Sequence, residues 1–221
     1  MTPLRAVLVL ALLPAPVLAL DFPDVPVPKG ARGERVSDHM RYNGLDMRAS
    51  QFSIDQPVER VRAFYLQEWE DQVADTALDG GGRVLGYLHR GRDYVTVTLR
   101  PAGRGTEGTI GVMRLPLEEV APDAVGKGFE RLPRTEVSED IVYLDTPRQV
   151  RTLNMSNAHS PFQNERFYTR QLGAQGYVRE PGDACQASSQ LCQVRYTRDS
   201  DRITVTAMRG KDATAIVAVI E

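Results

Sequence analysis

The sequence predicts an α+β protein made of two tandem repeats, each a mostly antiparallel sheet covered on one face by one helix. A strand, helix, strand, strand pattern around Phe64 and Tyr65 recurs around Phe167 and Tyr168. The segments VTVT (residues 95–98) and ITVT (residues 203–206) follow in the same order, and the matched positions differ by 103 to 108 residues. Because this period is much longer than that of a solenoid repeat, it indicates two duplicated domains.

The first repeat begins with a strand and then a helix. The strand is expected at residues 47–53, and the helix has Pro57 at its first position and runs to near Asp75. One helix face carries apolar residues at the spacing of an amphipathic helix, namely Val58, Val61, Tyr65 and Trp69. A glycine turn at residues 80–82 leads into three β-rich segments, at residues 84–89, 94–99 and 109–115.

The second repeat follows the same order of elements. A strand is expected at residues 150–155, and Ser160 caps a helix that has Pro161 at its first position and ends at Gly176. Three strands are then expected, at residues 193–196, 202–208 and 214–220.

The first nineteen residues have the pattern of a secretory signal peptide. Arg5 gives the positive start, residues 6–13 are an apolar run, and residues 17–19 (VLA) form a small-residue exit that predicts cleavage near Ala19. The apolar run is too short to span a bilayer, so no stable membrane anchor is expected. The protein is therefore predicted to be periplasmic or secreted.

The signal peptide, residues 1–19, is the first of four predicted segments. Residues 20–116 form the first repeat with an extended, proline-containing N-terminal segment. Residues 117–133 are the linker, because they contain Pro122 and the run Gly126-Lys127-Gly128. Residues 134–221 form the second repeat.

Charge excludes one broad class of partner. The formal net charge is −2, and it becomes −3 when Arg5 leaves with the signal peptide. Acidic and basic residues are interspersed without a basic block, so nucleic acid is not an expected partner.

The two cysteines, Cys185 and Cys192, are predicted to form a disulfide. They flank a polar hexapeptide, and an exported chain would normally oxidise such a pair. Reactive dithiols favour a C-x-x-C spacing at a helix start, so the pair reads as a structural staple and not as a redox site.

A helix that carries Phe-Tyr and is followed by Gly-aromatic, as at Gly176-Tyr177, resembles a small module of uncharacterised bacterial periplasmic proteins and lipoproteins. The tandem layout is also similar to the helix-grip domains of outer-membrane assembly lipoproteins. The resemblance implies helix-on-sheet units and an envelope location, and it brings no catalytic residues.

No catalytic, metal or cofactor motif stands out in the sequence. The G-x-G-x-x-G pattern at residues 103–108 lies between two expected strands and lacks the helix start that a dinucleotide site requires, so it predicts a hairpin turn. His39, His89 and His159 have no spacing typical of metal ligands on one element. We therefore expect no catalytic residue, no bound metal and no cofactor.

Four helix aromatics, Tyr65, Trp69, Phe167 and Tyr168, have two interpretations. They are core residues that bury each helix on its own sheet, or they line a cleft between helix and sheet that accepts a small apolar ligand. Their helical periodicity favours the core.

Three functions remain compatible with the sequence. The leading hypothesis is a non-catalytic binding module with an accessory or scaffold role in the bacterial envelope, acting on an envelope protein partner through an edge strand. The second is a carrier or sensor of a small apolar ligand in the helix-sheet cleft. The third is an unrecognised enzyme whose site is assembled from scattered residues.

Overall fold

One antiparallel sheet of twelve strands runs through the molecule, which is known from a computed structural model describing residues 20–70, 72–117 and 124–221. The first six strands are β1 (Arg32–Tyr42), β2 (Leu45–Ile54), β3 (Val73–Ala77), β4 (Arg83–His89), β5 (Asp93–Ala102) and β6 (Gly105–Arg114). The other six are β7 (Glu136–Tyr143), β8 (Val150–Asn157), β9 (Val178–Arg179), β10 (Leu191–Arg198), β11 (Asp201–Arg209) and β12 (Thr214–Ile220). Strands make up 49% of the chain, and the predicted α+β class is confirmed.

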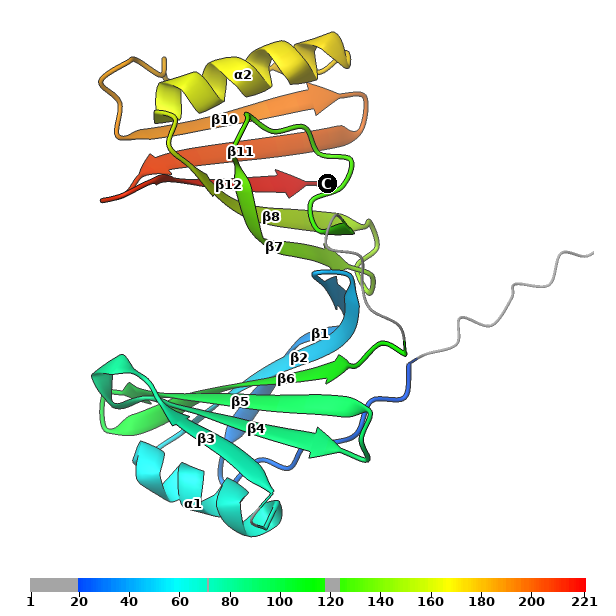
Figure 1. Cartoon of the computed structure of the whole chain (residues 1–221), viewed down its shortest axis with the longest axis vertical. Helices are drawn as coiled ribbons and strands as arrows, with labels where there is room; N and C mark the ends of the chain where they lie inside the picture. Colours follow the sequence, from blue (N-terminus) through cyan, green and yellow to red (C-terminus); the bar gives the residue numbers. More distant parts are fainter. Residues whose placement is uncertain (1–19, 71, 118–123) are drawn as a thin grey trace, which may run out of the picture.

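The strand order divides the sheet into two halves. The order is β3-β4-β5-β6-β2-β1-β7-β8-β12-β11-β10-β9, so β1–β6 form the first half and β7–β12 the second. Read outward from the centre, each half runs through its first, second, sixth, fifth, fourth and third strands. The described residues contain two α-helices, α1 (Val58–Glu68) after β2 and α2 (Pro161–Ala174) after β8. Figure 1 shows the two helices at opposite ends of the molecule.

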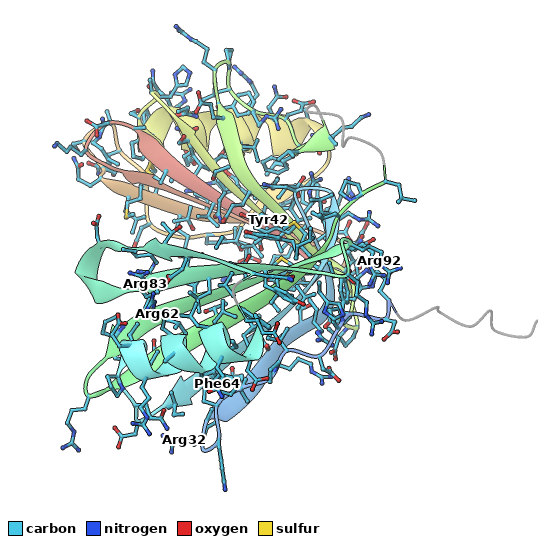
Figure 2. The ribbon with its side chains drawn as sticks, turned by 60° about the horizontal axis from the view of Figure 1, so that its bottom comes forward. Arg32, Tyr42, Arg62, Phe64, Arg83 and Arg92 are labelled. Carbon is cyan, nitrogen blue, oxygen red and sulfur yellow. A yellow bond between two sulfur atoms is a disulfide. The ribbon has the colours of Figure 1, made fainter. Side chains whose placement is uncertain are left out.

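A short ladder between β1 and β7 joins the halves. Met40 pairs with Tyr143, and Tyr42 pairs with Ile141. The side chains add polar contacts, since the Tyr42 hydroxyl donates to Glu139 at 3.0 Å and the Ser37 hydroxyl donates to Asp145 at 3.0 Å. Figure 2 shows Tyr42 at the boundary between the halves.

Each half buries one sheet face against its own helix. Along β5 and β11, buried residues alternate with more exposed ones, as expected for a sheet with one covered face. α1 contacts β4, β5 and β6, whereas α2 contacts β9, β10 and β11. Two separate apolar cores result, the first around Val61 and Tyr65 and the second around Tyr168 and Leu172.

The α2 boundaries follow the sequence prediction, but α1 does not. The Ser160 side chain accepts from the Gln163 main-chain N–H, and the Gln163 side chain accepts from the Ser160 N–H, which makes the capping box that starts α2. The prediction that the first helix runs to near Asp75 is wrong. Glu70 adopts a left-handed conformation with φ of 51°, α1 ends at Glu68, and the chain continues as the edge strand β3.

Two segments without helix or strand cover the sheet areas that the helices leave open. In the first strap, defined as residues 20–31, Phe22 is only 5% exposed and packs with Leu20 and Val25 against the first core. In the second strap, defined as residues 124–133, Phe129 and Leu132 pack against the second core. The predicted linker thus contains a packed segment, and its residues 118–123 lie outside the described part.

The predicted hairpin at the G-x-G-x-x-G segment is confirmed. Gly103, with a positive φ of 59°, lies in the turn between β5 and β6, and Gly105 already pairs with Ala102. The structure therefore offers no helix N-terminus here to bind a phosphate.

The predicted signal peptide lies outside the described residues, so its cleavage near Ala19 stays a prediction. Among residues 20–70, 72–117 and 124–221, no helix has the length and apolar character needed to cross a bilayer.

Cys185 and Cys192 form the predicted disulfide, with their Cα atoms 5.4 Å apart. Cys192 is the second residue of β10, and it is 4% exposed. We expect reduction to lower the free energy of unfolding by at most about 2.5 kcal/mol, because the closed loop restricts the unfolded chain. Urea unfolding of the oxidised and reduced protein measures this, and a Cys185→Ser/Cys192→Ser variant that is insensitive to reductant is the control. Equal stability of the two redox forms would contradict the expectation.

Candidate functional site

The four aromatic residues singled out in the sequence lie in the two cores, and one of them also lines a cavity. Tyr65 is 0%, Trp69 9%, Phe167 8% and Tyr168 2% exposed. The Trp69 ring stacks on Tyr87 with centroids 5.1 Å apart, so it packs helix against sheet. Only Tyr168 reaches the wall of a cavity that has the volume to hold a small molecule.

This cavity of about 290 Å³ lies in the second half, where the C-terminal part of α2, the second strap, the start of β11 and the end of β12 meet. Its apolar lining consists of Phe129, Tyr168, Leu172, Tyr177, Ile203 and Ile220. Its main polar lining consists of Glu130, Gln149, Arg151, Gln171 and Gln175. An apolar wall with a few polar groups is typical of small-ligand sites, and the volume is near the lower end of their range.

The Tyr168 hydroxyl is the unusual polar group of this cavity. The Tyr168 side chain is almost fully buried, and its hydroxyl has no hydrogen bond to another described residue, but its oxygen remains accessible to solvent, unlike that of Tyr65. Burial raises the pKa of Tyr168 to about 12, so the group stays a neutral donor. The nearby Tyr196 hydroxyl, in contrast, is 3.0 Å from the Thr169 hydroxyl. A ligand atom in the cavity can replace water as the partner of the Tyr168 hydroxyl.

Two arginines set the electrostatics around that hydroxyl. Arg151 donates to Asp140 at 2.8 and 2.7 Å, so its charge is neutralised within the protein. Arg131 donates to the main-chain oxygen of Gly126 at 2.9 Å and forms no ion pair among the described residues. Its positive charge opposes the rise in the pKa of Tyr168, which places it within electrostatic reach of the hydroxyl. Because the acidic Glu130 also lines the cavity, these charges select no sign, and the hydroxyl favours a ligand atom that accepts a hydrogen bond.

The matched position in the first half is identified by the sheet register. Arg151 pairs with Ile220, which pairs with Ile203, and all three line the cavity. The corresponding cross-strand row of the first half contains Arg48, Val112 and Val95, paired in the same way.

The first half has less open space at this matched position, and larger side chains lie in its core. Phe22 of the first strap belongs to the same buried cluster as Val95 and Val112. Trp69 follows Tyr65 at the distance in sequence at which Leu172 follows Tyr168, and its indole is much larger than the leucine side chain. A smaller hollow of about 140 Å³ remains at the matched row and is lined in part by Arg48 and Val112.

Tyr65 is the counterpart of Tyr168 in the first half, and its hydroxyl is fully buried. Its oxygen is buried without any partner, and burial raises its pKa. We expect Tyr65→Phe to raise the free energy of unfolding by about 1 kcal/mol, because an unpaired buried hydroxyl carries a desolvation penalty. Urea unfolding measures it. A loss of stability similar to that of a core truncation would show that the hydroxyl has a partner.

No second site with convergent chemistry is found in the described part of the chain. It contains no cluster of three or more His, Cys, Asp or Glu side chains that could hold a metal ion. His39 contacts Asp46 at 3.0 Å, and His159 lies 3.3 Å from the Pro133 oxygen, so each histidine has a local partner. His89 contacts the Tyr87 ring edge.

Three aspartates predict how stability depends on pH. Burial alone would raise the pKa of Asp75, Asp140 and Asp145, but ion pairs and hydrogen bonds outweigh it and hold each pKa below its usual value. Figure 2 shows Arg62 and Arg83, the two partners of Asp75, near each other beside α1. A carboxyl with a lowered folded-state pKa stabilises the fold above its unfolded pKa of about 3.9, and this contribution is lost as pH falls through the folded value.

We therefore expect the free energy of unfolding to be steady from pH 7 to about pH 5.5 and to fall below about pH 4. Urea unfolding at a series of pH values measures this. The Asp75→Asn variant should lose less on acidification than the unaltered protein, and a stability that rises with acidification would contradict the prediction.

Comparisons with known proteins give no information about this site. The chain matches no protein-family model, no curated protein and no solved structure.

Proposed function

We propose that this chain is an exported, non-catalytic binding protein that holds a small, partly apolar ligand in the cavity of its second half. The observation that carries the proposal is the cavity itself, whose mixed polar and apolar wall contains the Tyr168 hydroxyl, a donor without a protein partner among the described residues. A ligand acceptor atom would supply the missing hydrogen bond, and the apolar wall would bind the rest of the molecule. A carrier or a sensor needs only this binding step and no catalysis.

The two halves have arisen, in this proposal, by duplication of one binding unit. Both halves have the same outward strand order, with the helix inserted at the same point. Each strap also gives a main-chain oxygen to a matched arginine, Pro23 to Arg48 and Lys127 to Arg151. The first unit keeps the architecture but has only a hollow of about 140 Å³ at the matched position, so ligand binding is assigned to the larger cavity of the second unit.

Export to the periplasm or the outside is part of the same proposal. The predicted signal sequence supports it, and the Cys185–Cys192 disulfide is compatible with an oxidising compartment. The first strap begins directly after the predicted cleavage point, so the mature N-terminus would be held against the first core.

A ligand-observed NMR screen of the mature chain against a fragment library tests this function. We expect hits whose binding is abolished by Leu172→Trp, because this substitution places in the cavity the larger side chain found at the matched position of the first half. The matched control is Tyr65→Phe, which alters the first unit and should leave the hits unchanged. An absence of hits, or hits insensitive to Leu172→Trp in a variant that still folds, would refute the proposed site.

A second candidate function is that of an accessory or scaffold protein in the envelope. It is favoured by the free edge at β3, which has five residues and no strand on its outer side. The opposite edge, β9, has only two residues, so one edge is open and the other is short. An extended strand of an envelope protein could pair with β3 by strand addition.

In-cell cross-linking followed by mass spectrometry tests this alternative. The Leu78 N–H donates to Gly82 across the turn, so the alternation of the antiparallel ladder turns the Ala77 N–H to the open side of β3. A partner captured by the unaltered chain should be lost in Ala77→Pro, because proline removes this outward donor. Ala77→Val keeps the donor and serves as the control. Capture that persists in Ala77→Pro would exclude this edge as the binding surface.

A further inference from the structure

A second hollow lies beside the cavity of the second half, where β1 and β7 join the two halves (Figure 1). This junction hollow has a volume of about 470 Å³. Its described lining comes from both halves and the second strap, and consists of Arg41, Gly44, Ala124, Asp140, Val142, Gln149 and Arg151. Gln149 and Arg151 also line the cavity, so the two hollows meet at these side chains.

One cross-strand row, a single residue wide, runs through both hollows. Arg41 of β1 pairs with Val142 of β7, which pairs with Arg151 of β8. The row continues to Ile220 of β12 and Ile203 of β11. Its first three members line the junction hollow, and its last three line the cavity. Because neighbouring strands lie about 4.8 Å apart, these five residues extend over about 19 Å on one face of the sheet.

Arg41 is the charged end of this row. Its side chain is 52% exposed, and its one ion pair among the described residues is a long contact of 3.9 Å with Asp46. Asp46 makes a closer contact, at 3.0 Å, with His39. Arg151, the other arginine of the junction hollow, is already hydrogen-bonded to Asp140. The Arg41 guanidinium can therefore bind an anion through two parallel N–H groups, as arginine does with carboxylates.

The charge of the two hollows orients such an anion. The described lining of the junction hollow contains Arg41, Arg151 and Asp140, so its formal charge is that of one cation, which matches a singly charged carboxylate. The cavity is lined by one acidic residue, Glu130, which repels an anion at that end. A carboxylate is thus favoured in the junction hollow and disfavoured in the cavity.

The cavity end of the row suits an uncharged chain with one acceptor. Ile203 and Ile220 are apolar, and Leu172 lines the same wall. The Tyr168 hydroxyl, which also lies in this wall, has no hydrogen bond to another described residue and can donate to an oxygen of the ligand. The row is therefore cationic at one end and apolar with a single donor at the other.

We propose that the ligand is an unbranched chain with a carboxylate at one end and a neutral acceptor, a hydroxyl or carbonyl oxygen, at the other. The carboxylate lies at Arg41, the chain follows the row past Val142 and Arg151, and the acceptor receives a hydrogen bond from the Tyr168 hydroxyl. This inference rests on the proposed function, since it extends the ligand of the same cavity across the junction. The first half contributes Arg41 to the site.

The test uses the mature chain and three probes. The first is 10-hydroxydecanoate, the second is decanoate, which lacks the acceptor, and the third is 10-amino-1-decanol, which carries the opposite charge. Binding is measured by protein NMR titration. We expect 10-hydroxydecanoate to bind about tenfold more tightly than the amine, because attraction at Arg41 becomes repulsion, and about fivefold more tightly than decanoate, because decanoate cannot accept from Tyr168.

Three variants locate the two ends of the ligand. Arg41→Gln should weaken 10-hydroxydecanoate about fivefold and should reduce its advantage over the amine, a change of selectivity that a purely structural role would not cause. Arg35→Gln alters another exposed arginine of β1, which lines neither hollow, and should change no affinity. Tyr168→Phe should weaken 10-hydroxydecanoate and leave decanoate unchanged.

The outcomes separate this ligand class from the proposed function. Equal binding of carboxylate and amine, or unchanged binding in Arg41→Gln, would overturn the carboxylate site at the junction. Equal binding of 10-hydroxydecanoate and decanoate would overturn the acceptor end. Failure of all three probes while fragment hits sensitive to Leu172→Trp remain would overturn the ligand class alone. Failure of the probes together with an absence of such hits would overturn both.

Discussion

Asp140→Ala is expected to lower the free energy of unfolding by about 3 to 5 kcal/mol, the range for a buried ion pair that loses one partner. Asp140 accepts two hydrogen bonds from Arg151 and a third, at 2.8 Å, from the main-chain N–H of Gly126. The Asp140 side chain is only 9% exposed, and that of Arg151 is 24% exposed. The change would leave the Arg151 charge poorly solvated and would release the second strap from β7. Urea unfolding at pH 7 measures the effect.

An exposed pair and a double variant are the controls for this prediction. Glu180→Ala removes the partner of Arg195 in a pair that is 33% and 54% exposed, and it should cost less than about 1 kcal/mol. Asp140→Leu combined with Arg151→Met should recover much of the loss, because no unpaired charge remains. If Asp140→Ala and Glu180→Ala have the same small effect, the buried pair does not anchor the strap.

The sequence was most informative where alternation and capping signals were strong. The segment VTVT of β5 and the segment ITVT of β11 have the strict alternation of half-buried strands, and both are central strands. Ser160, Pro161 and Gln163 give the start of α2 by local hydrogen bonds alone, so this boundary could be predicted. Such signals depend on neighbours in the chain and not on the tertiary fold.

Strands that depend on distant partners were missed. β1 and β7 lie at the join between the halves, carry charged residues and contain register shifts near Ser37 and Glu139, so their alternation is broken. β9 has only two residues, and β3 is a polar edge strand whose Asp75 is satisfied by two arginines. In these strands, pairing with a neighbour, which no local pattern encodes, determines the structure.

Of the residues that line the cavity, only Tyr168 had been singled out from the sequence as a possible ligand contact. The other walls come from residues 129, 177, 203 and 220, which meet because the second strap crosses the ends of β11 and β12. The matched arginines Arg48 and Arg151 were a usable signal, since both stand near the start of the second strand of a half. What could not be predicted is the difference between the halves, because it depends on where Phe22 of the first strap lies in space.

Trp69→Ala is expected to lower the free energy of unfolding by about 3 to 5 kcal/mol, the range for truncation of a large buried aromatic side chain. The Trp69 ring is stacked on Tyr87 at 5.1 Å and lies 4.9 Å from Tyr65, so its loss leaves a cavity between α1 and β4. Urea unfolding measures the loss. Phe64→Ala, which truncates a partly exposed aromatic of the same helix, should cost less and is the matched control.

Fragment binding by the same variant separates the two interpretations of the helix aromatics. If Trp69 is core and the ligand site is in the second half, Trp69→Ala will be less stable while hits sensitive to Leu172→Trp remain. A variant that keeps its stability but loses all fragment binding would place the ligand cleft in the first half, beside Tyr65. The combination expected here, lost stability with retained binding, would arise because the first half keeps only a small hollow at the matched position and the second keeps a larger cavity.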